Sequence, residues 1–334
     1  MKKNIFDFQF FLFICVVCLL VAHNGCGNST SPKTSQTIPP QTIRRIESPQ
    51  RLISTAPSLT ELLFDIGLGD RVVGDSKFTT YPPETNKIEK IGGLYDGNWE
   101  KIVELKPDLV LILDKNESFR LRCQELGIES LAVDHGSMEG VLESYHLIGK
   151  RFGAEIMQKA LDKKTELENK LQTLRAKSEE LPPIRVLICI DRLRGNGQLQ
   201  NLYVAGTNPY FQDAIHWAGG TNVAASTNLA IPVLSVEGVV AMNPEVIIDL
   251  MVGAKVQAAE NGEEITENDL INDWKTLGNE VDAVKTGKIY VLTEDYATIP
   301  GPRTPLFVEK LLEILHGEKI KQNPENNNET TTTE

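Results

Sequence analysis

The sequence predicts an α/β protein with two Rossmann-like lobes joined by one long connecting helix, and three observations support this prediction. Residues 100–113 and 237–250 have nearly the same pattern: a glutamate opens a helical stretch, and a proline and an acid precede an apolar run. Patterns typical of strands and of helices alternate through both halves of the chain. Between the halves, residues 154–178 carry apolar side chains along one helical stripe.

These patterns divide the chain into segments. Residues 50–153 are expected to form an N-terminal α/β lobe, residues 154–180 the connecting helix, and residues 184–318 a C-terminal α/β lobe. Residues 26–49 are rich in Ser, Thr, Pro and Gln and are expected to be a disordered tether. Residues 319–334 have few core-forming side chains and are expected to be a disordered tail.

The first lobe is predicted to alternate strands and helices. Ser58 is expected to be the N-cap of the first helix, with Glu61 completing a capping box and Gly67 ending the helix. Pro107 ends a later helix, because proline cannot continue it. The predicted strands are 51–55, 71–74, 108–113 and 128–133, and the predicted helices are 58–67, 99–105, 116–127 and 136–153.

The second lobe repeats this order, and Pro209 opens a helix there as Pro57 does in the first lobe. Its predicted strands are 184–190, 245–250 and 288–292, and its helices include 210–219, 236–242 and 305–317. The connecting helix would be about 37 Å long at 1.5 Å per residue, enough to reach across two domains. A single stiff helix allows the lobes to rock but resists a large hinge motion.

The composition is that of an acidic globular protein. The chain has 334 residues, of which 41% are hydrophobic and 24% charged, and its formal net charge is −12. Nucleic acid selects basic surfaces, so this charge argues against a nucleic-acid partner. We expect the protein to act as a monomer.

Residues 1–25 have the pattern of a signal peptide, in which lysines precede an apolar run, residues 10–22, that is too short to cross a bilayer comfortably. Cys26 follows in a context that resembles a bacterial lipoprotein processing site, where the cysteine is acylated. The alternatives are simple cleavage after Ala22 and a membrane anchor formed by the apolar run itself. We therefore expect a lipoprotein anchored to a membrane on its periplasmic or extracellular face.

Two segments of the first lobe are similar to a known family. APSLTELLFDIGLGDRVVGDSKFTTYPPE (56–84) and KIGGLYDGNWEKIVELKPDLVLI (90–112) resemble the substrate-binding proteins of ABC importers for vitamin B12, haem and iron–siderophore complexes. The resemblance covers roughly residues 50–318. It implies two α/β lobes joined by one backbone helix, a ligand held in the cleft between them, and no enzymatic activity.

The resemblance also implies a role for the repeated glutamates. Glu100 and Glu237 match the positions at which such proteins present one surface glutamate per lobe to arginines of a permease dimer. A pseudo-twofold binder would offer one charge per lobe to a twofold partner. The expected partner is an ABC importer permease dimer with its ATPase subunits. The alternative is a favourable interaction of each glutamate with its own helix dipole.

Ligand-binding candidates follow from the rule that loops at the carboxyl ends of strands line the cleft of an α/β fold. They are Ser58, Tyr81, Leu94, Tyr95, Tyr203, Ile231, Asp295 and Tyr296. Tyr81 and Asp295 match positions where family members that bind corrinoids place ligand contacts, and Leu94 and Ile231 stand where such members often have aromatic residues. For each tyrosine the alternative is a half-buried packing residue.

The expected ligand is a corrinoid of the vitamin B12 type. Binders of anionic siderophore complexes often use several arginines, and Arg192, Arg194 and Arg303 are the only plausible ones here. An iron–siderophore complex or haem is the alternative. A metal-ion-binding lipoprotein is a weaker alternative, because the histidines lack metal-site spacing. We expect no metal site and no resident cofactor. The sequence lacks the G-x-S-x-G nucleophile motif that is typical of hydrolases.

The lipoprotein hypothesis can be tested at Cys26. Replacing it by serine (Cys26→Ser) should release soluble protein or leave an uncleaved precursor, because serine cannot carry the lipid. Cell fractionation and the apparent mass of the processed chain measure this outcome. A Cys26→Ser protein that is still processed and still fractionates with the membrane would show that Cys26 is not the anchor.

Overall fold

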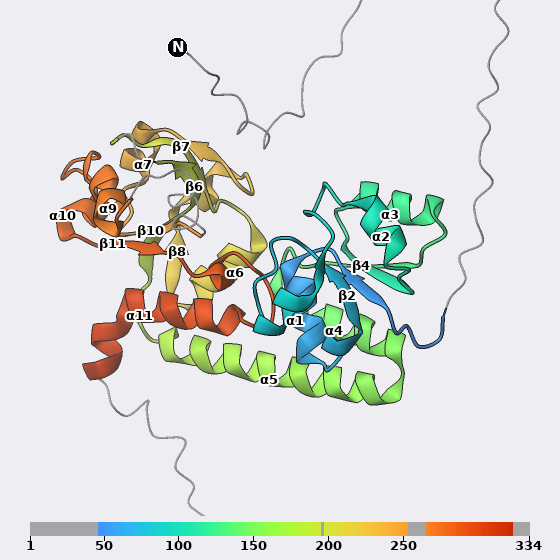
Figure 1. The fold of residues 1–334 in the computed structure, drawn as a ribbon. Coiled ribbons are helices and arrows are strands. Elements are labelled where there is room, and N and C mark those ends of the chain that lie inside the picture. The colour runs from blue at the N-terminus through green and yellow to red at the C-terminus, as the bar shows by residue number, and fades with distance from the viewer. Residues whose placement is uncertain (1–45, 195–196, 253–264, 323–334) are drawn as a thin grey trace, which may run out of the picture. The chain divides into compact units, whose positions relative to one another are not determined.

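The protein contains two sheets, one in each half of the chain, and this confirms the predicted α/β fold class. The computed structural model describes residues 46–194, 197–252 and 265–322, and these residues belong to one compact unit. The first sheet has the order β3-β2-β1-β4-β5, and the second has the order β11-β10-β6-β7-β9, with β8 pairing β6 (Figure 1).

All five strands of the first sheet are parallel. The inner strand β4 is buried almost throughout, as expected for a parallel strand covered on both faces. The strands are β1 (Leu52–Ser54), β2 (Val72–Asp75), β3 (Glu89–Lys90), β4 (Leu109–Leu113) and β5 (Ser130–Val133), and the helices are α1 (Pro57–Asp65), α2 (Trp99–Glu104), α3 (Glu117–Glu125) and α4 (Met138–Phe152).

The second sheet includes an antiparallel strand that the sequence did not predict. Strand β7 pairs antiparallel with the far half of β6, where exposed Asp191 alternates with buried Arg192. Helix α11 continues to Gln322, past the end expected for this lobe at residue 318. The strands are β6 (Ile184–Leu193), β7 (Gln200–Val204), β8 (Gly220–Asn222), β9 (Val233–Leu234), β10 (Val246–Leu250) and β11 (Ile289–Leu292), and the helices are α6 (Pro209–Trp217), α7 (Val236–Met242), α9 (Glu267–Lys275), α10 (Asp282–Thr286) and α11 (Thr304–Gln322).

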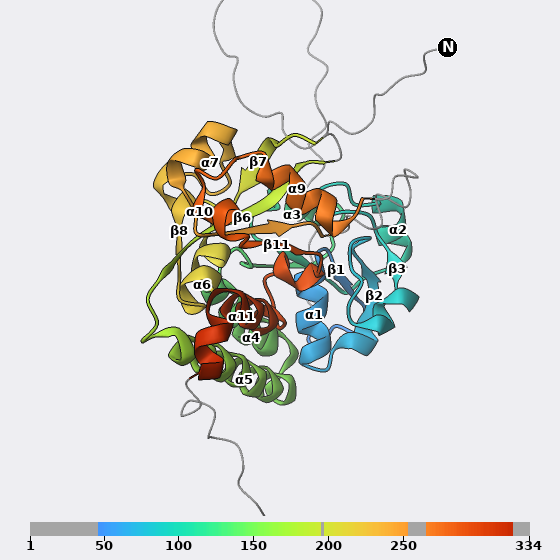
Figure 2. The same cartoon turned by 90° about the vertical axis from the view of Figure 1, so that its left-hand side faces the viewer.

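Helix α5 (Ala154–Ser178) joins the two halves. It packs against α4 of the first lobe and against α6 and α11 of the second, and Figures 1 and 2 show α11 lying beside it. Its buried Leu167, Leu171 and Leu174 belong to a core cluster that also contains Leu59 of α1 and Phe307 of α11. The two lobes therefore share one hydrophobic core through this helix.

The start of the described chain is fastened to the first lobe. Arg151 of α4 donates hydrogen bonds to the carbonyls of Ile46 and Glu47 and pairs with Glu129. Residues 46–49, the end of the expected tether, therefore contact the lobe. The predicted signal peptide, Cys26 and the rest of the expected tether lie outside the described residues. Within the described ranges, no helix has the length and apolar character needed to cross a bilayer.

Candidate functional site

The first helix begins differently from the prediction. Pro57 is its first residue and Ala56 its N-cap, which offers no side-chain cap, so Ser58 lies inside the helix and the expected capping box is absent. Proline is favoured at the first helical position because its missing N–H needs no partner there. The Glu61 side chain is therefore free to make a different contact.

That contact is a buried ion pair with Arg303. The guanidinium donates from Nε to Glu61 Oε2 at 2.9 Å and from Nη2 to Glu61 Oε1 at 2.6 Å. The Glu61 side chain is 2% exposed and that of Arg303 is 13% exposed. Burial raises the pKa of Glu61, although the hydrogen bonds and the charge of Arg303 act in the opposite direction. Such a pair fixes α1 to the turn that precedes α11.

Arg303 also holds two of the predicted ligand-binding residues. Its Nη1 donates to Asp295 Oδ1 at 2.7 Å, and its guanidinium carbon lies 4.3 Å from the centre of the Tyr81 ring, a cation–π contact. Thr80 Oγ1 donates to the other oxygen of Asp295 at 2.9 Å. We call Glu61, Thr80, Tyr81, Asp295 and Arg303 the Arg303 cluster.

The environment of Asp295 keeps its carboxyl group ionised. Partial burial acts to raise the pKa of Asp295, but the hydrogen bonds from Arg303 and Thr80 and the charge of Arg303 together lower it. Ser58 is buried and lies near Gly301, two residues before Arg303, because a Cβ placed on Gly301 would be 3.8 Å from the Ser58 Cα and Cβ atoms. The structure thus brings Tyr81 and Asp295, which lie far apart in the sequence, to one guanidinium.

A second group of predicted residues lies in the loop before α2. Tyr95 is 64% exposed, and Leu94 is half-buried, with its carbonyl accepting a hydrogen bond from Asn116. Phe78, which the sequence analysis did not single out, is 59% exposed, and its ring would lie 3.1 Å from a Cβ on Gly93. The only available signal for Phe78 was its place in the same strand-to-helix loop as Tyr81.

Three further predicted residues lie on the second lobe. Tyr203 is half-buried in β7, opposite Asp191 of β6 and Val233 of β9. Ile231 is 49% exposed just before β9. Tyr296 is half-buried, and its carbonyl accepts a hydrogen bond from the Tyr210 hydroxyl at 3.3 Å. Tyr203 and Ile231 belong to elements other than those that form the Arg303 cluster, whereas Tyr296 follows Asp295 of the cluster in one short 3-10 turn, Asp295–Ala297.

The repeated glutamates occupy equivalent positions on their helices. Glu100 and Glu237 are each the second residue of a short helix, α2 and α7, and both are exposed. The N-caps are Asn98 and Ser235, whose side chains accept hydrogen bonds from the backbone three residues later. Hydrogen bonds from its own backbone and from Ser235 lower the pKa of Glu237.

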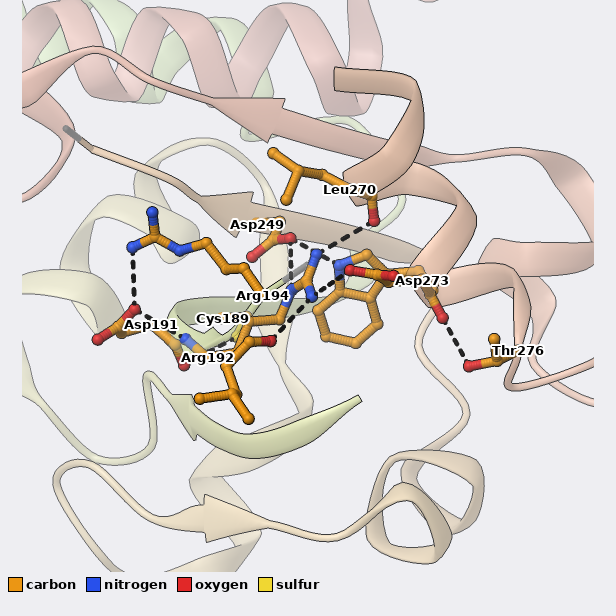
Figure 3. A network of polar contacts seen from close by, with 10 residues as sticks. Cys189, Asp191, Arg192, Arg194, Asp249, Leu270, Asp273 and Thr276 are labelled. Carbon is orange, nitrogen blue, oxygen red and sulfur yellow. Dashed lines mark hydrogen bonds and ion pairs between the residues drawn. The ribbon is translucent and has the colours of Figure 1, made fainter. Parts of the chain in front are cut away.

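The other two arginines considered for an anionic ligand are also paired. Figure 3 shows Arg192 inside the second lobe, where it donates to Asp249 at 2.9 Å, to Asp273 at 2.7 Å and to the carbonyl of Leu270. The Trp274 indole donates to the same Asp249 oxygen at 2.8 Å. The Arg192 side chain is fully buried, so it ties β6, β10 and α9 together and does not face a ligand. Arg194 pairs with Asp191.

Comparisons with known proteins agree with this architecture. The model of a family described as periplasmic binding protein matches residues 52–296. The chain is similar to YvrC, an uncharacterised ABC transporter substrate-binding lipoprotein of Bacillus subtilis, with 29% identity over 89% of this chain and 94% of the relative. It is 28% identical to a vitamin B12-binding protein of Vibrio vulnificus, over 82% of this chain and 92% of the relative.

A solved structure shows the same fold. The periplasmic vitamin B12-binding protein BtuF of Vibrio cholerae superposes with a TM-score of 0.65 at 24% identity, covering 82% of this chain and 99% of that one.

The Arg303 cluster predicts a pH-dependent stability. Replacing Arg303 by methionine should lower the free energy of unfolding by about 3 kcal/mol at pH 7, because Glu61 is left buried without a partner. Without Arg303 the pKa of Glu61 should rise further and that of Asp295 should no longer be lowered. A carboxyl group whose pKa is raised in the folded protein stabilises the fold only at low pH. One whose pKa is lowered in the folded protein stabilises it only at higher pH. The loss of unfolding free energy caused by Arg303→Met should therefore be larger at pH 7 than at pH 4.

Urea unfolding at both pH values measures this difference. Arg120→Met is the matched control, because Arg120 forms an exposed pair with Glu117 on α3 and its loss should leave stability near that of the wild type. Adding Glu61→Gln to Arg303→Met should flatten the pH dependence. A deficit that is equal at pH 4 and pH 7 would contradict this electrostatic account.

Proposed function

Because this chain belongs to the periplasmic binding protein family, we propose that it captures a corrinoid of the vitamin B12 type and delivers it to an ABC importer permease. Members of the family are substrate-binding transport proteins and not enzymes, so the chain is not an enzyme. Substrate-binding proteins of ABC importers bind a small molecule and hand it to a permease. The identity of the ligand is what the residues of the site must decide.

The Arg303 cluster is the observation that carries the corrinoid proposal. It gathers a half-exposed aromatic ring, Tyr81, and an ionised acceptor, Asp295, at the point where the two lobes are in contact. Arg303 is already bound by two carboxylates, Arg192 is also bound by two, and Arg194 pairs with one. The site therefore offers apolar surface and a hydrogen-bond acceptor, which suit a large uncharged ligand better than an anionic one.

Haem or an iron–siderophore complex is the second candidate, and one observation favours it. Tyr95 is 64% exposed and Tyr81 is 44% exposed. A tyrosine oxygen is a suitable ligand for ferric iron in haem proteins. The corrinoid remains the first candidate, because the Arg303 cluster carries more negative than positive charge.

The location and the partners are part of the same proposal. We propose that Cys26 carries a lipid and holds a monomeric protein at the outer side of a membrane, as the lipoprotein name of the similar YvrC suggests. Glu100 and Glu237 would each pair with an arginine of the permease dimer, whose ATPase subunits drive uptake. Their equivalent helix positions and their exposure support this assignment.

The ligand can be tested by titrating the purified mature protein with cobalamin, haem and ferric siderophores. We expect tight cobalamin binding, and we expect Tyr81→Ala to weaken it by about 2 kcal/mol or more, as for a buried aromatic anchor. Calorimetry measures both quantities. Leu306→Ala is the control, because Leu306 on α11 is exposed to a similar degree but is not a candidate contact. Tight haem or siderophore binding without cobalamin binding would replace the corrinoid by the second candidate.

The docking role of the glutamates can be tested with the double variant Glu100→Ala/Glu237→Ala. Permease association and uptake should fall, because two arginines would be left unpaired at the interface, while ligand affinity should stay unchanged. Reversal of both residues to lysine should impair association further.

A matched control separates docking from the helix dipole. Glu139 and Glu155 are also exposed second residues of helices, in α4 and α5. If the dipole is all that matters, the variant Glu139→Ala/Glu155→Ala should behave like the first double variant, with slightly lower melting temperature and normal association. Normal permease association by Glu100→Ala/Glu237→Ala would therefore rule out docking.

A further inference from the structure

The Arg303 cluster has a buried part and an exposed part, and they differ in how readily they can exchange partners. Resting on the proposed function, we propose that an uncharged amide group of the ligand replaces Thr80 as the hydrogen-bond donor to Asp295. The site would then select macrocycles that carry amides at their rim over macrocycles that carry carboxylates.

The buried part is the pair of Glu61 and Arg303. Two parallel hydrogen bonds join them, and their side chains are only 2% and 13% exposed. Breaking this pair would leave a carboxylate buried without compensation, which is costly. We therefore infer that this pair persists when a ligand binds, and that it holds the Arg303 guanidinium in place.

The exposed part is the hydrogen bond between Thr80 and Asp295. The Asp295 side chain is 29% exposed and Thr80 is exposed. Arg303 holds Asp295 Oδ1, so that Oδ2 keeps a fixed direction, and the neutral hydroxyl of Thr80 donates to it. A ligand N–H can take this place without leaving a buried charge unpaired, because the Thr80 hydroxyl can turn to water.

The charge of the Arg303 cluster favours an amide of the ligand over a carboxylate. The cluster contains two carboxylates and one guanidinium, so it carries one net negative charge. Two lysines in the loops around Tyr81 are paired as well, since Lys77 binds Asp96 and Lys90 binds Asp75. A ligand amide would donate to Asp295, whereas a ligand carboxylate would meet it as a like charge, which opposes binding. Tyr81, fixed on Arg303, stands next to Thr80 and would contact the same ligand.

Two corrinoids with the same macrocycle and different rim charge test the proposal. Dicyanocobinamide carries amides, and dicyanocobyrinic acid carries carboxylates on the same macrocycle. At pH 7 the wild-type protein should bind the amide form at least tenfold more tightly, as measured by calorimetry. Asp295→Asn, which removes the negative charge, should reduce this preference to less than threefold.

Thr80→Val tests the exchange itself. Removing the competing hydroxyl should strengthen binding of dicyanocobinamide about threefold, because Asp295 Oδ2 then lacks its hydroxyl donor in the free protein. Thr165→Val on α5, whose hydroxyl bonds only to the carbonyl of Leu161, is the control and should bind as the wild type does. Weaker dicyanocobinamide binding by Thr80→Val would show that Thr80 supports the bound site and is not replaced.

The outcomes distinguish this inference from the proposed function. If the wild-type protein binds neither corrinoid, the proposed ligand is wrong. If it binds dicyanocobinamide but Asp295→Asn keeps the wild-type preference, corrinoid binding stands and selection by Asp295 is overturned. Equal wild-type affinity for the two corrinoids would also overturn it.

Discussion

The ion pair between Glu61 and Arg303 is the constraint on which the candidate site depends. It joins residues that are 242 positions apart in the chain, one on α1 of the first lobe and one before α11 of the second. The same guanidinium also contacts the Tyr81 ring and the Asp295 carboxylate, and so holds both residues in place. Because a buried ion pair contributes little net stability against an apolar alternative, its value here lies in fixing geometry.

The connecting helix provides the second constraint. Leu167, Leu171 and Leu174 of α5 pack into a core cluster that contains residues from both sheets, in addition to one smaller cluster within each lobe. We expect this arrangement to limit the relative motion of the lobes to small displacements. A site formed by contributions from both lobes then needs only short side-chain movements to admit a ligand, and the Thr80 hydroxyl is suited to such a movement.

The sequence was sufficient for features that depend on local patterns. Buried runs such as residues 109–113 and the helix start at Pro209 were predicted because periodicity and proline chemistry act within a few residues. The predicted capping box at Ser58 was wrong, because Pro57 takes the first helical position. The Glu61 side chain pairs with Arg303 instead. Partners so distant in the chain leave no periodic signal, so the sequence suggested Arg303 only as a possible contact of an anionic ligand and not as the residue that holds Tyr81 and Asp295.

The shared core has a practical consequence for finding the ligand. A molecule that binds only the folded protein raises the unfolding free energy by an amount set by its concentration relative to its Kd. Because residues of both lobes belong to one core cluster, the increase in unfolding free energy stabilises the whole compact unit and not one lobe alone. A simple melting screen against a library of macrocycles would therefore register any true ligand as a displaced transition, whichever lobe it touches first.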